Sequence, residues 1–227
     1  MNLRIHTEIE NDVLVGLAWF SGVDASEENP FWGEMDTLAE SMRQAYGGRA
    51  PAEIDGLEPA RRLYRTFGVD PTRTRPSSEA LLRRVLKGQE LYRVNRLVDA
   101  CNWSSLAMLL PVWLYDIDNI QGDMEIRVGT SGEAFQGIRK SEVHVEGRLT
   151  IADNAGAFGS PTSDSFRTRI TPETTSALAV VFAPGDFSLL QMEEGVTQLI
   201  GHVNHWCGGA EDGALIMGGR ERSGPDV

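Results

Sequence analysis

The sequence lacks most of the patterns from which familiar catalytic and metal-binding centres are built. Its 227 residues include only two cysteines, Cys101 and Cys207, too far apart for a disulfide framework or a zinc pattern. It contains no phosphate-binding glycine loop, no dinucleotide-binding glycine motif and no Gly-x-Ser-x-Gly turn with a serine nucleophile. We therefore expect no cofactor, no metal ion and no serine-hydrolase triad.

Long hydrophobic runs are also missing. No apolar stretch approaches the ~18 residues of a membrane-spanning helix. Near the N-terminus, acidic residues interrupt the apolar stretch that a signal peptide would need. The expectation from these two absences and from the scarcity of cysteine is a protein of the reducing cytoplasm with no membrane partner.

Positive charge is scarce overall but concentrated in one place. The chain has 21 basic and 33 acidic residues, a formal net charge of −12, which argues against a whole-surface nucleic-acid binder. Residues 61–96 nevertheless hold ten basic and only three acidic residues, a net +7 against −19 for the remainder. Nearly all of the basic residues are arginines, which suit bidentate contacts with phosphate. The segment indicates a local anionic partner, unless its arginines are solvated or pair with the surplus acids.

The order of predicted elements indicates an α+β fold. Helical spacing and stop signals predict helices over 35–45, 59–67, from Ser77 or Ser78 to before Gly88, 94–108 and 187–207. Apolar and β-branched runs predict strands over 3–9, 12–20, 112–117, 124–128, 143–152 and 177–183, the first two as a hairpin or adjacent strands. Helices that come first in the chain, followed by antiparallel strands, favour an α+β fold over a doubly wound sheet. We expect one domain over 1–208 and a frayed, polar, Gly-rich tail over 209–227.

Three local constellations carry candidate chemistry. Residues 164–169, within a long loop predicted over 153–174, combine an acid, hydroxyls and two arginines, suited to clamping a small polar group or to forming a local turn. Asp116 and Asp118 are spaced for acid–base work or, as we favour, for capping a turn. Residues 202–207 contain two histidines and a cysteine but no further ligand, so histidines near a helix end are the simpler explanation.

Several motifs in a fixed order resemble a known family. The two specific motifs are DPTRTRPSSEAL from Asp70 to Leu81 and RRVLKG from Arg83 to Gly88. NRLVDxxN from Asn95 to Asn102 comes next. Shorter motifs follow at 115–118, 125–127 and 132–133, and then the loop over 153–174. Together they resemble the B3/B4 domain, the tRNA-binding and editing module of the phenylalanyl-tRNA synthetase beta subunit. The chain looks most like free-standing single-domain relatives of that module, over roughly residues 10 to 205.

The resemblance implies a fold, a partner and a reaction. The family fold is a three-layer α+β arrangement built on a β-sandwich of unusual topology with flanking helices. The module holds the mischarged 3′ end of tRNA, and a positioned water hydrolyses the ester without a protein nucleophile. The family carries a histidine where this chain has Trp113, whose flat apolar surface suits stacking a base or packing a side chain.

Candidate site residues follow from the resemblance and from the charge pattern. For the aminoacyl pocket the candidates are Asn102, Trp113, Tyr115, Asp116, Gly159, Asp164, Arg167 and Arg169. For contact with the tRNA acceptor end they are Arg73, Arg75, Arg83, Arg84 and Arg96. The leading hypothesis is binding of aminoacyl-tRNA with hydrolysis of mischarged species. The alternatives are a non-catalytic binder of an amino acid or nucleoside, and a module that docks on another protein.

Overall fold

Five helices and eleven strands make up the part of the chain that the structure describes. The structure is a computed structural model, and it describes residues 2–28, 30–138 and 142–220. The helices are α1 (Trp32–Tyr46), α2 (Glu58–Thr66), α3 (Ser77–Leu86), α4 (Arg96–Met108) and α5 (Leu189–Cys207). The strands are β1 (Leu3–Ile5), β2 (Val13–Ser21), β3 (Val112–Asp116), β4 (Met124–Val128), β5 (Ala134–Phe135), β6 (Val143–His144), β7 (Leu149–Asp153), β8 (Gly156–Ser160), β9 (Ser163–Asp164), β10 (Ser176–Pro184) and β11 (Ala210–Gly218).

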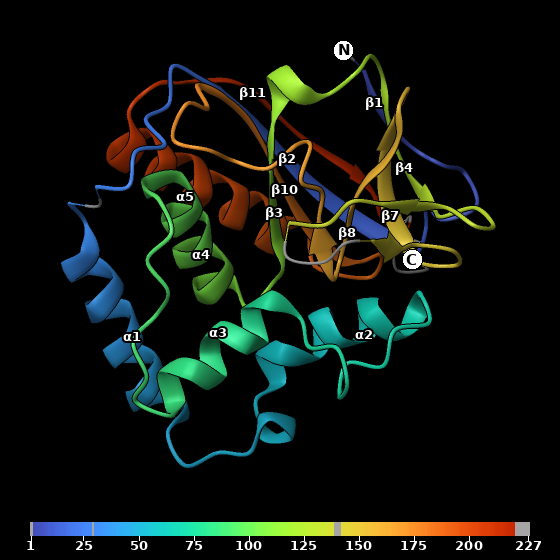
Figure 1. Cartoon of the computed structure of the whole chain (residues 1–227). Helices are drawn as coiled ribbons and strands as arrows, with labels where there is room; N and C mark the ends of the chain where they lie inside the picture. The colour runs from blue at the N-terminus through green and yellow to red at the C-terminus, as the bar shows by residue number, and fades with distance from the viewer. Residues whose placement is uncertain (1, 29, 139–141, 221–227) are drawn as a thin grey trace, which may run out of the picture.

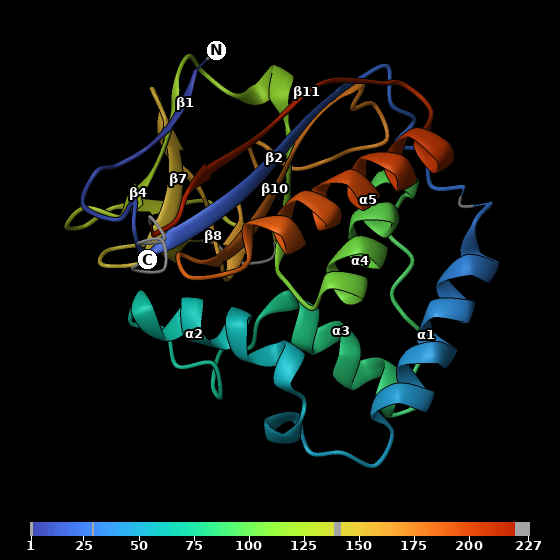
Figure 2. The same cartoon turned by 180° about the vertical axis from the view of Figure 1, so that it is seen from behind.

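Two large sheets and a layer of helices form the three layers that the family resemblance implied, and β5 and β6 pair in a separate two-stranded sheet. One sheet has the order β1-β4-β7-β8-β9 and the other the order β11-β2-β10-β3. Helices α4 and α5 lie over the outer face of the four-stranded sheet, as Figures 1 and 2 show. The α+β class is confirmed, and the sheet order, with sequence neighbours β1 and β2 in different sheets, gives the sandwich its unusual connectivity.

The central strand β10 shows why the sandwich and the helices pack closely. Leu178, Val180 and Phe182 fill the space between the two sheets. The alternate positions Ala177 and Ala179 are small and face the helical side. Gly16 in the neighbouring β2 has the same role, because an added Cβ would lie 2.5 Å from Val196 of α5. A strand buried on both faces can therefore meet a sheet on one side and a helix on the other.

Helices α1, α2 and α3 form a lobe beside the sandwich (Figure 1), and a buried ion pair joins two of them. Arg61 of α2 donates from Nε and Nη2 to the carboxylate of Glu79 on α3, both at 2.8 Å. Arg83 Nη1 approaches the same carboxylate at 3.4 Å, and the Glu79 side chain is only 1% exposed. The role of Glu79 is therefore not limited to the first turn of α3, because its carboxylate links α3 to α2.

Three sequence-based predictions about strands are wrong in detail. The predicted hairpin of 3–9 and 12–20 does not form, because β1 pairs in parallel with β4 while β2 lies in the other sheet. The predicted strand 143–152 is two strands, β6 and β7, separated by a turn at Gly147, where φ is +69°. The predicted loop over 153–174 contains β8 and β9.

The expected frayed tail is also corrected in part. Residues 210–218 form β11, which pairs antiparallel with β2 along nearly its whole length. The apolar run Ala214–Met217 indicated a strand, but the polar residues of the rest of the tail outweighed it in the prediction. The remainder of the predicted tail, residues 221–227, lies outside the described residues.

Candidate functional site

A cavity of about 490 Å³ lies between α3, α4, strand β3 and the segment around β9. Most of its wall is aliphatic, formed by Val94, Val98, Val112, Leu114, Val143 and Ile170. Its polar groups come from Ser77, Asn102, Thr162, Ser163, Asp164 and Arg169. An apolar cavity with a few polar groups is the usual form of a small-molecule site.

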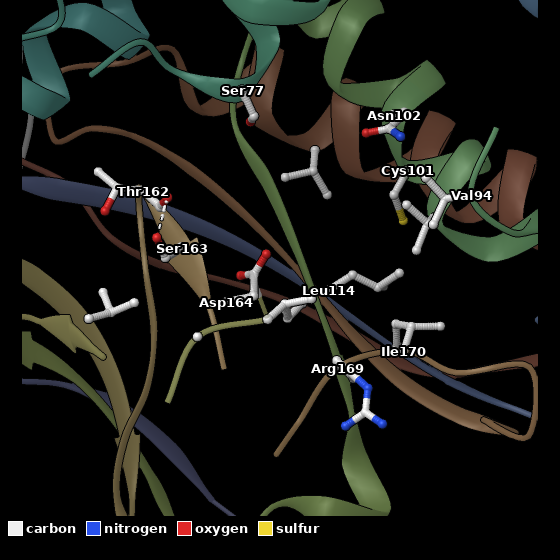
Figure 3. A pocket seen from close by; sticks show the side chains of 15 residues that line it. Ser77, Val94, Cys101, Asn102, Leu114, Thr162, Ser163, Asp164, Arg169 and Ile170 are labelled. Carbon is white, nitrogen blue, oxygen red and sulfur yellow. Dashed lines mark hydrogen bonds between the residues drawn. The ribbon is translucent and has the colours of Figure 1, made fainter. Parts of the chain in front are cut away.

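Asp164 is the carboxylate of this cavity. Figure 3 shows its side chain pointing toward the middle of the cavity, whereas the guanidinium of Arg169 points away from it. Among the residues that the structure describes, no side chain or backbone group hydrogen-bonds or ion-pairs with this carboxylate. Removal from bulk water raises the pKa of Asp164 to about 7. The group can therefore accept or donate a proton near neutral pH.

The NRLVDxxN motif builds one wall of the cavity. The Asn95 side chain accepts from Val98 N at 2.9 Å and so caps α4. Asp99 accepts from the backbone N of Val94 at 3.1 Å, which holds the preceding segment against the helix. These two contacts place Val94, Val98 and Asn102 on the cavity wall.

A second, positively charged hollow of about 400 Å³ adjoins the cavity, and we call it the basic groove. Its cations are Arg75, Arg83, Arg84 and Lys87. No acidic side chain is among the described residues that line it. The groove and the cavity have Ser77, Val94 and Asn102 in common, so a bound molecule can extend from one into the other.

The two predicted aromatic residues of β3 do not line the cavity. Trp113 is 4% exposed and packs against Phe182, with 3.9 Å between ring centroids, in the core between the sheets. Tyr115 is fully buried on the same face. Because side chains alternate along a strand, the cavity receives Val112 and Leu114 instead. The expectation that Trp113 offers a stacking surface is therefore wrong.

Asp116 and Arg167 have structural partners away from the cavity. Asp116 accepts from Thr174 Oγ1 at 2.7 Å and from the backbone N of Asp118 at 3.0 Å, the turn-capping role favoured above. Arg167 binds the carboxylate of Asp153 at 2.8 and 2.9 Å. Neither residue lines the cavity.

Two of the predicted RNA-contacting arginines also lie elsewhere. Arg96 binds Asp24 at 2.6 Å and the backbone O of Glu28 at 2.9 Å, and its side chain is only 19% exposed. Its charge is therefore committed within the fold. Arg73 is 88% exposed near Asp70, outside the groove lining. Arg75, Arg83 and Arg84 are the three that the structure brings together.

Comparison with known proteins agrees with the motif order. A family model described as the B3/4 domain matches residues 59–186, which include α2, α3, α4, the basic groove and the cavity wall. The chain belongs to the B3/4 domain family. No curated protein matches it.

One solved structure similar to this B3/4 protein is an N-terminal fragment of the phenylalanyl-tRNA synthetase beta-subunit from Pyrococcus horikoshii. The TM-score is 0.44 and the sequence identity 12%, over 95% of this chain and 53% of that chain. This chain thus spans about half of the fragment.

Neither a metal-binding cluster nor a membrane-spanning helix is present in the described part of the B3/4 protein. Over the described residues, no group of three or more His, Cys, Asp or Glu side chains is arranged to hold a metal ion. No helix in the same part of the chain is both long and apolar enough to cross a membrane.

The sequence analysis of the B3/4 protein missed the aliphatic wall, Ser77 and Tyr92. The wall residues come from four separate segments, so no local pattern groups them. Tyr92 lines the basic groove and is 57% exposed. An aromatic residue in a short, polar connection within the basic segment was the available signal.

Gly159, a pocket candidate from the sequence, does not line the cavity of the B3/4 protein but lies against Tyr115 and Ile151. Its replacement gives a testable prediction. A Cβ at this position would lie 2.0 Å from Tyr115 Oη and 2.9 Å from Ile151 Cγ2. We expect Gly159→Ala to lower the free energy of unfolding by about 2 kcal/mol, because a buried pair of strands must move. Urea denaturation measures the change.

The Tyr115 hydroxyl provides the control for that prediction. It is buried and has no hydrogen-bond partner among the described residues. Tyr115→Phe alone should therefore cost little, and in the double variant it should recover part of the loss. A Gly159→Ala protein as stable as the wild type would contradict this account.

Proposed function

We propose that this protein binds the aminoacylated 3′ end of tRNA and hydrolyses the ester of mischarged species. The observation that carries the proposal is the junction of the basic groove with the apolar cavity through Ser77, Val94 and Asn102. An aminoacyl-tRNA end has the same two parts, a polyanionic strand and an amino acid joined to it. The resemblance of the motifs to an editing module supports the same partner.

The basic groove suits the strand. Its four cations can neutralise phosphates of the acceptor end. Arg83 is partly committed to Glu79, while Arg75 and Lys87 have no ion-pair partner among the described residues. Because the rest of the protein is strongly acidic, the contact with RNA is confined to this surface.

The cavity suits the aminoacyl group. Its aliphatic wall can bury a side chain, and its volume of about 490 Å³ lies in the range of small-ligand sites. Asn102 lies at the junction, where the ester would sit, and can hydrogen-bond to it. Asp164 faces the same space from the opposite side.

Asp164 gives the reaction a base. As a carboxylate it accepts a proton from a water molecule, and the water oxygen attacks the ester carbonyl carbon. The bond between that carbon and the ribose oxygen then breaks, and the ribose oxygen takes up the proton. The products are free amino acid and uncharged tRNA. This role would place the protein in the cytoplasm.

Deacylation of a panel of mischarged tRNAs tests the proposal. We expect at least one aminoacyl-tRNA to lose its amino acid faster with the protein than without it, as measured by loss of acid-precipitable labelled amino acid. A correctly charged tRNA of the same sequence is the matched control. If no member of the panel is cleaved above the uncatalysed rate, the hydrolytic function is wrong.

The cavity also favours a second candidate, a non-catalytic binder of an amino acid or nucleoside. The specific observation is Asp164, since an unpaired carboxylate in an apolar cavity can bind a ligand's ammonium or hydroxyl group. A thermal-shift screen distinguishes this candidate, because a ligand that binds the folded state raises the melting temperature. Stabilisation by a free amino acid together with no deacylation would favour it.

A further inference from the structure

Tyr92 is an exposed aromatic ring inside the basic groove. Its side chain is 57% exposed although tyrosine is largely apolar. The guanidinium of Arg84 lies over the ring, with 4.0 Å between Arg84 Cζ and the ring centroid. Arg84 is itself held by a hydrogen bond from Nε to the backbone O of Glu90. One face of the ring is thus covered by a fixed cation, and a planar group can stack on the other.

The junction of groove and cavity determines which part of a bound strand meets this ring. With the amino acid in the cavity, the ester and the terminal ribose lie at Val94 and Asn102, which line both spaces. The base on that ribose must then lie in the groove. Tyr92 precedes Val94 by two residues and lines the groove but not the cavity.

We propose that Tyr92 stacks on the 3′-terminal nucleobase of the bound RNA, with Arg84 fixing the ring from the opposite face. This inference rests on the proposed function and adds a base-binding subsite to it. Every nucleobase has a π-face, so stacking on Tyr92 is tolerant of base identity and requires a single-stranded end. The subsite recognises the end of the strand and leaves the choice of amino acid to the cavity.

The chain contains a matched control for this subsite. Phe166 is 43% exposed, and Arg169 lies over its ring with 3.6 Å between Arg169 Cζ and the centroid. The pair has the chemistry of Tyr92 and Arg84, but Phe166 lines neither the groove nor the cavity. A general loss of exposed aromatic surface would affect both positions equally.

The test is equilibrium binding of a fluorescently labelled oligonucleotide that ends in CCA, measured by anisotropy at low salt. Tyr92→Leu is expected to weaken binding about tenfold, the loss of one stacked base. Tyr92→Phe should bind as the wild type does, because the ring remains, and so should Phe166→Leu. A second oligonucleotide, identical but with an abasic terminal ribose, should bind the wild type and Tyr92→Leu equally.

The outcomes distinguish failure of the Tyr92 subsite from failure of the proposed function. Wild-type affinity of Tyr92→Leu for the intact oligonucleotide would overturn the subsite and leave the proposed function standing. An equal loss in Phe166→Leu, or a further loss of Tyr92→Leu on the abasic end, would likewise overturn it. Failure of the wild-type protein to bind either oligonucleotide would instead contradict the proposed function itself.

Discussion

Replacing Asp164 with asparagine is expected to slow ester hydrolysis about 100-fold, the contribution of a positioned general base. Asparagine has nearly the same shape but cannot accept a proton from water. Asp164 is the acidic residue among the described residues that line the cavity, and its carboxylate has no hydrogen-bond or ion-pair partner among them that could act in its place. The measurement is the single-turnover deacylation rate on the substrate that the panel identifies.

The pH dependence of the rate gives a second test of Asp164. Its pKa is raised to about 7, so the wild-type rate should rise with pH up to about neutrality and then level off. This rise should disappear in Asp164→Asn. Asp118→Asn, which removes an exposed carboxylate outside the cavity, is the control and should keep both rate and profile.

The stability of Asp164→Asn distinguishes loss of the general base from loss of the fold. The folded protein retains a proton on Asp164 up to about pH 7, whereas an unfolded chain releases it near the ordinary aspartate range. Ionisation of this group therefore lowers stability as pH rises between those values. Asp164→Asn should be at least as stable as the wild type at neutral pH. Loss of activity in an Asp164→Asn protein that is also unfolded would not support Asp164 as the base. An Asp164→Asn protein that keeps the wild-type activity would refute this role.

Replacing Glu79 with glutamine is expected to lower the free energy of unfolding by about 3 kcal/mol. The carboxylate is 1% exposed and receives two 2.8 Å hydrogen bonds from Arg61. Removing its charge takes away the carboxylate that both Arg61 and Arg83 contact. Urea denaturation monitored by tryptophan fluorescence measures the loss.

The acid limb of the stability profile checks the same ion pair. Burial raises the pKa of Glu79, but the hydrogen bonds and charges of Arg61 and Arg83 outweigh burial and hold the pKa below its ordinary value. The pair therefore stabilises the protein above the pKa of the unfolded chain and loses its effect as pH falls through the folded pKa. Glu79→Gln should have a flatter acid limb.

Glu58 offers the control for this prediction. It pairs with Arg65 in the same helix α2, but its side chain is 52% exposed. Glu58→Gln should therefore change the free energy of unfolding by less than about 1 kcal/mol. An equal effect at both positions would show that burial of Glu79 is not what matters.

Local sequence signals were sufficient for the helices of the site. Asn95 caps α4 and the prolines before Ser77 precede α3, both close to the predicted positions. The predicted helix over 59–67 is within one residue of α2. These elements follow short-range signals of helix initiation and termination, although only α4 among the three has a side-chain N-cap, at Asn95.

Long-range pairing was harder to predict. The polar and Gly-rich residues on either side of the short apolar run 214–217 concealed β11, which forms because β2 offers it an edge about 200 residues earlier in the chain. Trp113 was assigned to the cavity because the family resemblance aligns it with a histidine of the pocket. The strand was placed correctly, but Trp113 lies on the face that packs between the sheets. The face of a strand residue is fixed by what packs on either side, and a one-residue error reverses it.

The sequence by itself determined the α+β class, the family motifs and the concentration of positive charge over 61–96. Only the tertiary structure decided which of those charges are free for a ligand. It committed Arg61 to Glu79 and Arg96 to Asp24, and left Arg75 and Lys87 in the basic groove. The physical reason is that a charge becomes available or neutralised through neighbours that are distant in the chain, and folding alone brings those neighbours together.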